Sequence, residues 1–87
     1  MSKKPFHEVV LDKMELRVPC VIISRGAEHE LRELGEILVL SELPKEKKGE
    51  IISRLKRFVL MLSPVGDEAR AWRFLRELIE KISWEEK

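Results

Sequence analysis

Side chains that can carry out chemistry are scarce in this chain. It has two His, one Cys and no Asn, Gln, Thr or Tyr, and most of its polar residues are Glu, Lys and Arg. The segment from His29 to Glu33 begins like the zinc-binding H-E-x-x-H motif, which needs two His one helical turn apart. Glu33 occupies the second position, and no third ligand is visible. We therefore expect an exposed His beside an acidic neighbour, and no metal.

Cys20 follows Pro19 in an apolar run, which is typical of a small buried hydrophobe. A nucleophilic thiol would need an activating His or a helix N-terminus, and neither His7 nor His29 can be placed beside it from the sequence. No Gly-rich phosphate loop or dinucleotide fingerprint occurs. The sequence therefore predicts a protein that is not an enzyme and that needs no cofactor.

The length of 87 residues predicts a single domain over residues 1–87. A domain this small is marginally stable, and one cysteine allows no internal disulfide, so self-association is the common remaining means of stabilisation. Abundant Glu and Lys without Asn or Gln are typical of proteins from hot environments. A designed chain with a reduced alphabet would look similar.

The formal net charge of +1 indicates no global attraction to nucleic acid or to an anionic membrane. No run of 18 apolar residues occurs, so we expect no membrane association. Charged residues interrupt the N-terminal segment before any signal-peptide core could form. We expect a soluble, cytoplasmic protein.

Apolar residues at three- and four-residue steps predict three helices after residue 26. One covers 27–43, a second opens near Pro44 and closes before Ser63, and a third runs from Asp67, its expected N-cap, to the C-terminus. Gly35 lies inside the first helix. A helix that ends there, followed by a strand over 37–41, is the competing interpretation.

The first 25 residues fit two interpretations. Met14, Leu16 and Val18 alternate with charged residues as a half-buried strand would, whereas a helix from Pro5 towards Leu16 is also compatible. The predicted fold class is therefore mainly α: a small helical bundle with three helices after residue 26 and an N-terminal helix or short strand element. The alternative is an α+β fold with a small N-terminal sheet.

Three apolar runs, at 20–23, 37–40 and 58–62, are continuous rather than periodic. Four or five successive apolar residues on a helix cover most of its circumference, so they need cover on more than one side. We predict an interaction module that binds a protein partner or a second copy of itself. The candidate interface residues are Ile37, Leu38, Val39, Leu40, Phe58, Val59, Leu60, Met61, Leu62 and Trp84.

Charge divides the middle of the chain. Residues 26–43 carry five Glu against one Arg, and residues 44–63 carry six basic residues against two Glu. The simplest account is that two antiparallel neighbouring helices attract each other. The alternative is a small nucleic-acid-binding protein, in which a basic helix over 45–57 contacts phosphates. Its candidate contacts are Lys45, Lys47, Lys48, Arg54, Lys56 and Arg57.

Overall fold

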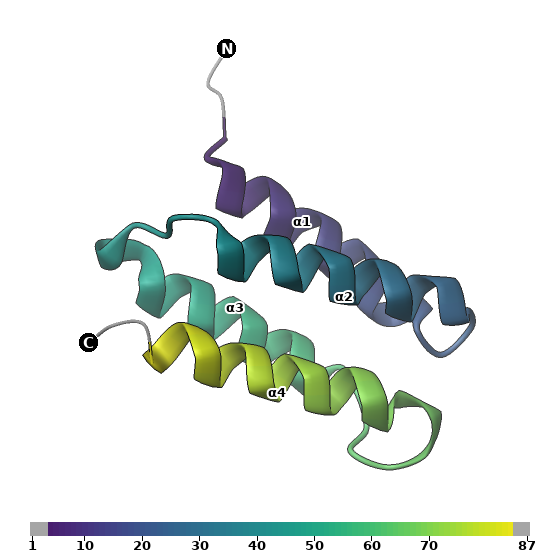
Figure 1. Cartoon of the computed structure of the whole chain (residues 1–87). Coiled ribbons are helices and arrows are strands. Elements are labelled where there is room, and N and C mark those ends of the chain that lie inside the picture. The colour runs from purple at the N-terminus through teal and green to yellow at the C-terminus, as the bar shows by residue number, and fades with distance from the viewer. Residues whose placement is uncertain (1–3, 85–87) are drawn as a thin grey trace.

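Two helical hairpins make up the fold in this computed structural model, which describes residues 4–84 (Figure 1). The first hairpin joins α1 to α2, and the second joins α3 to α4. The helices within the described residues are α1 (Phe6–Arg17), α2 (Arg25–Leu40), α3 (Lys48–Leu60) and α4 (Ala69–Trp84).

The first hairpin packs on the second (Figure 1). α2 contacts both α1 and α4, and α3 contacts α4 and, over a shorter stretch, α1. The chain therefore places α2 diagonally across the bundle from α3. Both connections within hairpins lie at one end of the bundle, and the α2–α3 connection lies at the other (Figure 1).

Each helix contributes one apolar stripe to a common core. The buried residues recur at three- and four-residue steps, which is the spacing that keeps side chains on one helical face. They include Val10, Leu11 and Met14 of α1, Ala27, Leu31 and Leu38 of α2, Ile51, Leu55 and Phe58 of α3, and Ala71, Leu75, Leu78 and Ile82 of α4.

Gly35 permits the close approach of α2 to α4. A Cβ atom built at Gly35 would lie 2.5 Å from Cζ of Phe74 and 3.2 Å from Cδ2 of Leu78. The first distance is well below van der Waals contact. The sequence was also compatible with a helix that ends at Gly35. The structure instead places this glycine, buried, in the middle of α2.

Short 3-10 turns precede or follow the helices: η1 (Val18–Cys20), η2 (Lys45–Lys47) and η3 (Gly66–Glu68). The predicted N-cap at Asp67 is wrong, because Asp67 lies inside η3, and Val65 precedes that turn. Glu68 takes part instead, since its carboxylate accepts a hydrogen bond of 3.1 Å from the backbone N–H of Ser63. Gly66 supplies the positive φ of 79° that the turn requires.

The described residues contain no strand, so the small N-terminal sheet and the strand over 37–41 are both wrong. The alternation at Met14, Leu16 and Val18 was misleading because Leu16 is 70% exposed while the other two are buried. Met14 and Val18 are four residues apart and share one helical face instead. The interpretation as an N-terminal helix, and the mainly α fold class, are confirmed.

The predicted attraction between an acidic helix and its basic neighbour is also wrong. α2 and α3 occupy diagonal positions, and no ion pair joins them within residues 4–84. The cross-helix ion pairs link other elements: Arg17 of α1 to Glu30 of α2, and Arg54 of α3 to Asp12 and Glu15 of α1.

Candidate interaction surfaces

The apolar run at the end of α2 divides between core and surface. Leu38 lies in the core, Val39 is half-buried, and Ile37 and Leu40 are exposed, with Leu40 at 86%. The helix ends directly after Leu40, and the Ser41 hydroxyl donates to the Ile37 carbonyl at 2.6 Å. Of the predicted interface residues in this run, Leu38 is therefore unavailable to a partner, and Leu40 is the most accessible.

The run at the end of α3 divides in the same way. Phe58, Val59 and Leu62 are buried, whereas Leu60 is 83% exposed and Met61 is exposed beside it. The helix ends at Leu60, so the chain turns inward again at Leu62. The continuous apolar run is thus explained mostly by the core and by the turn, and two side chains remain for a partner.

The two predicted interface turns do not form one surface. α2 and α3 run in opposite directions, so Leu40 and Leu60, each at the C-terminal end of its helix, lie at opposite ends of the bundle (Figure 1). Trp84 ends α4 on the same side of the molecule as the end of α2, and it is exposed.

Two shallow grooves flank α4. The groove between α2 and α4 has a volume of 280 Å³, and its walls include Val39, Leu40 and Phe74. The groove between α3 and α4 has a volume of 400 Å³, and its walls include Val59, Leu60 and Ile79. One highly exposed leucine lines each groove, Leu40 in the first and Leu60 in the second.

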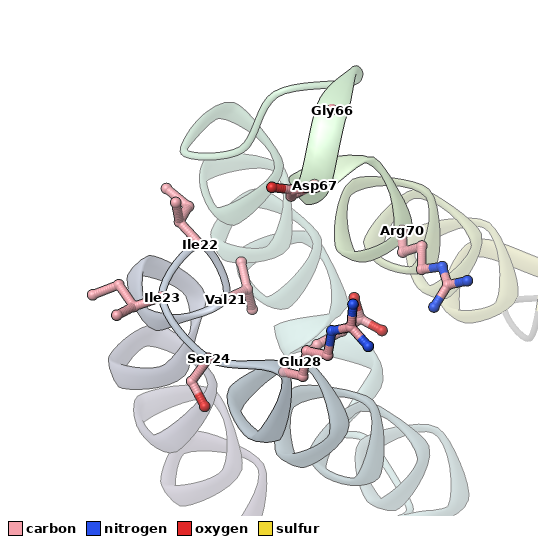
Figure 2. Close-up of a pocket in the computed structure, with 9 residues that line it drawn as sticks. Val21, Ile22, Ile23, Ser24, Glu28, Gly66, Asp67 and Arg70 are labelled. Carbon is pink, nitrogen blue, oxygen red and sulfur yellow. The ribbon is translucent and has the colours of Figure 1, made fainter.

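A larger hollow of 640 Å³ lies at the end of the bundle where both hairpins turn (Figure 2). Residues 21–25 and Glu28 line one side, and Gly66, Asp67 and Arg70 line the other. Ile22 and Ile23 lie at the edge of the hollow, with their side chains on the outer side of the first loop (Figure 2), and Ile23 is 85% exposed. Leu16, Met61 and Val65, which are also exposed, belong to the segments that enter or form these two turns.

We define the loop end as Leu16, Ile22, Ile23, Met61 and Val65 together with the residues that line the hollow. Of all these residues, only Met61 was a predicted interface residue. The signal was in the sequence, because 20–23 is one of the three continuous apolar runs. Its burial could not be predicted without knowing whether the run formed a strand, a helix or a turn.

The predicted phosphate contacts of α3 are not equivalent. Lys48 is buried, with 6% of its surface exposed, and Lys47 lies 3.6 Å from the Glu50 carboxylate. Lys56 faces the α3–α4 groove, whereas Arg54 and Arg57 line a different hollow together with Glu46 and Glu50. Lys45 is exposed in η2. Lys48 is buried, and Lys47 and Arg54 lie beside carboxylates, so these cations are not equally available to a phosphate.

Arg54 is held by two carboxylates of α1. Its Nη2 donates to Asp12 Oδ1 and Glu15 Oε1, each at 3.0 Å, and Lys4 Nζ donates to the other Asp12 oxygen at 2.8 Å. The hydrogen bond from Lys4, followed by that from Arg54, lowers the pKa of Asp12. The bond to Asp12 raises the pKa of Lys4 in return. The network links α1 to α3 and occupies the guanidinium that was predicted to meet a phosphate.

His29 and Cys20, the residues with catalytic or metal-binding potential, each contact a residue four positions away along the chain. His29 Nε2 lies 2.8 Å from Glu33 Oε1 on the exposed side of α2, as the sequence predicted. Cys20 is half-buried, and its thiol donates to the Leu16 carbonyl at 3.5 Å. No group of three or more His, Cys, Asp or Glu suited to holding a metal occurs in the part of the chain that the structure describes.

None of the helices within residues 4–84 is long and apolar enough to cross a membrane. No family model matches the chain, and neither curated proteins nor solved structures gave a match.

Proposed function

We propose that this protein is a non-enzymatic interaction module that self-associates through apolar side chains at the ends of its helical bundle. The observation that supports the proposal is the gathering of large apolar residues at helix ends and turns, where the core does not need them. Ile23, Leu40 and Leu60 are each more than four-fifths exposed. Scattered single apolar residues are normal on surfaces, whereas several at one end of the bundle, such as Ile22, Ile23 and Met61, mark an interaction site.

The size of the chain supports the same function. A domain this small has little core for its surface, and its one cysteine can form no internal disulfide. Burial of exposed apolar surface against a second copy would add stability that the single chain lacks. The composition, rich in Lys and Glu and without Asn or Gln, supports a source that lives at high temperature. A cytoplasmic location fits a chain whose one cysteine forms no internal disulfide.

The alternative of nucleic-acid binding has less support. A phosphate backbone is bound by several cations that act together on one face. Here Arg54 is already paired with Asp12 and Glu15, Lys48 is buried, and acidic residues line the hollow beside Arg57. We therefore place self-association first.

The proposal is tested by the mass of the protein in solution. Light scattering after size-exclusion chromatography, over a wide range of concentration, is expected to give a species heavier than one chain. A triple variant with Ile23→Asp, Leu40→Asp and Leu60→Asp is expected to be monomeric. Circular dichroism serves as the control, because these exposed positions can change without loss of the helical core. A wild-type protein that stays monomeric at every concentration would overturn the proposal.

A further inference from the structure

We infer that the loop end is the self-association surface and that it docks on the loop end of a second copy about a two-fold axis. This inference rests on the proposed self-association and adds where it occurs and with what symmetry. A two-fold interface uses the same patch on both partners, so the patch must be complementary to itself. The loop end meets this requirement in apolar content, in charge and in shape.

The apolar content comes from both hairpins. Ile22 and Ile23 belong to the α1–α2 connection, Leu16 lies in the last turn of α1, and Met61 and Val65 belong to the α3–α4 connection. All five are exposed in the single chain. Because the hollow is lined from both connections, the two loops lie next to each other and present their apolar residues at one end.

Charge identifies the occupant. Arg25 and Arg70 line the hollow together with Glu28 and Asp67, so its charges balance. Within residues 4–84, neither of these arginines nor Asp67 forms an ion pair, and Glu28 lies 3.7 Å from Arg32. A surface that carries both signs can pair each arginine with an acid of a second copy turned by 180°, whereas a partner of a single sign, such as nucleic acid, is repelled by half of these charges.

Shape supports the same arrangement. Ile22 and Ile23 line the hollow together with Val21, Glu28, Asp67 and Arg70. In Figure 2, the Ile22 and Ile23 side chains lie on the far side of the first loop from Glu28 and Arg70. A convex apolar loop therefore lies directly beside a concave charged hollow. After a two-fold rotation, the apolar loop of each copy meets the apolar loop of the other, and the two charged hollows face each other. This places apolar residues on apolar residues and each arginine near the partner's acids.

The first test compares two positions of matched exposure. Ile23 is 85% exposed at the loop end, and Leu40 is 86% exposed at the opposite end of the bundle. Ile23→Asp is expected to raise the dimer dissociation constant at least about tenfold, because it places a charge among apolar residues in the contact. Leu40→Asp is expected to leave that constant within about twofold of the wild type.

The second test exploits the balance of charge. A variant with Arg25→Glu and Arg70→Glu makes the hollow acidic, and a variant with Glu28→Lys and Asp67→Lys makes it basic. Each variant alone is expected to dimerise at least about tenfold more weakly than the wild type, and an equimolar mixture is expected to form heterodimers. Native mass spectrometry distinguishes the three species, and circular dichroism confirms that both variants remain helical.

The outcomes separate this inference from the proposed function. If the wild type is monomeric, self-association itself is wrong. If the wild type is a dimer that Leu40→Asp dissociates and Ile23→Asp does not, self-association stands and the loop-end site is overturned. Association that grows with concentration beyond a dimer would overturn the two-fold symmetry, as would charge variants that mix at random.

Discussion

At the scale of single residues, Gly35 carries the clearest structural consequence. Glycine inside a helix costs about 1 kcal/mol relative to alanine, so its presence in α2 requires a compensating contact. That contact is the Phe74 ring, which occupies the space where a Cβ would lie. The Arg32 guanidinium in turn lies 5.5 Å from the centre of the same ring. The glycine thus allows α4 to place an aromatic side chain directly against α2.

We predict that Gly35→Ala lowers the free energy of unfolding by about 1 kcal/mol, because displacement of Phe74 outweighs the gain in helix propensity. Gly49→Ala is the matched control, since nothing lies within 4 Å of its Cβ position in α3, and it is expected to stabilise by about 0.5 to 1 kcal/mol. Chemical denaturation measures both changes.

A double-mutant cycle locates the cause. In a Phe74→Ala background, Gly35→Ala is expected to become neutral or stabilising, because the ring that it displaces is absent. If Gly35→Ala costs the same in both backgrounds, the contact with Phe74 does not explain the glycine.

Which single residues of an apolar run are exposed could be predicted only in part. Leu38 follows Leu31 by seven residues, so its place in the core was visible from spacing. The exposure of Leu40 and Leu60 depends on where α2 and α3 end. A helix end changes the direction of the next side chain, and a sequence pattern alone does not locate an end to within one residue.

At the scale of elements, the helices were predictable and their pairing was not. Periodic apolar residues define α2, α3 and α4 because each stripe must be buried. The pairing was predicted from opposite charge, and that prediction failed. Exposed ion pairs contribute about 0 to 1 kcal/mol, whereas burial of one large apolar side chain contributes about 1.5 to 3 kcal/mol. Fit between apolar stripes therefore decides which helices pack together.

The α1–α3 link at Asp12 predicts a particular dependence on pH. The pKa of Asp12 is lowered from its ordinary 3.8. A carboxyl whose pKa is lower in the folded state than in the unfolded state stabilises the fold fully at any pH above its unfolded-state pKa. This stabilisation is lost as the pH falls through the folded-state pKa. We predict that Asp12→Asn is less stable than the wild type at neutral pH and that the difference shrinks towards zero in acid below 3.8.

Thermal denaturation between neutral and strongly acidic pH measures this difference. Glu36→Gln provides the control, because Glu36 is an acidic residue of α2 that forms no ion pair within residues 4–84. Its profile is expected to run parallel to that of the wild type. A gap between Asp12→Asn and the wild type that stays constant into acid would contradict the role of the ionised carboxylate.

At the scale of the whole molecule, the mainly α class was predictable because periodic apolar stripes occupy most of the chain. The loop end was not predictable as a surface. Its apolar residues come from segments about 40 positions apart, such as Ile22 and Val65, and only the stacking of two hairpins brings these turns to one end.

Self-association predicts that thermal stability depends on concentration. A species that forms only between folded chains stabilises them by mass action, so the melting temperature is expected to rise with protein concentration. Ile23→Asp is expected to abolish that rise while Leu40→Asp preserves it. Calorimetry at several concentrations makes the comparison, and a wild-type melting temperature independent of concentration would contradict the account.

The most direct test of the central claim is the mass of the wild-type protein in solution, measured by light scattering with absorbance at 260 and 280 nm at low and high salt. We predict a dimer that carries no nucleic acid and that persists at high salt, because apolar burial rather than exposed charge holds it together. A monomer that carries nucleic acid, released as salt rises, would contradict this account and favour the basic residues of α3.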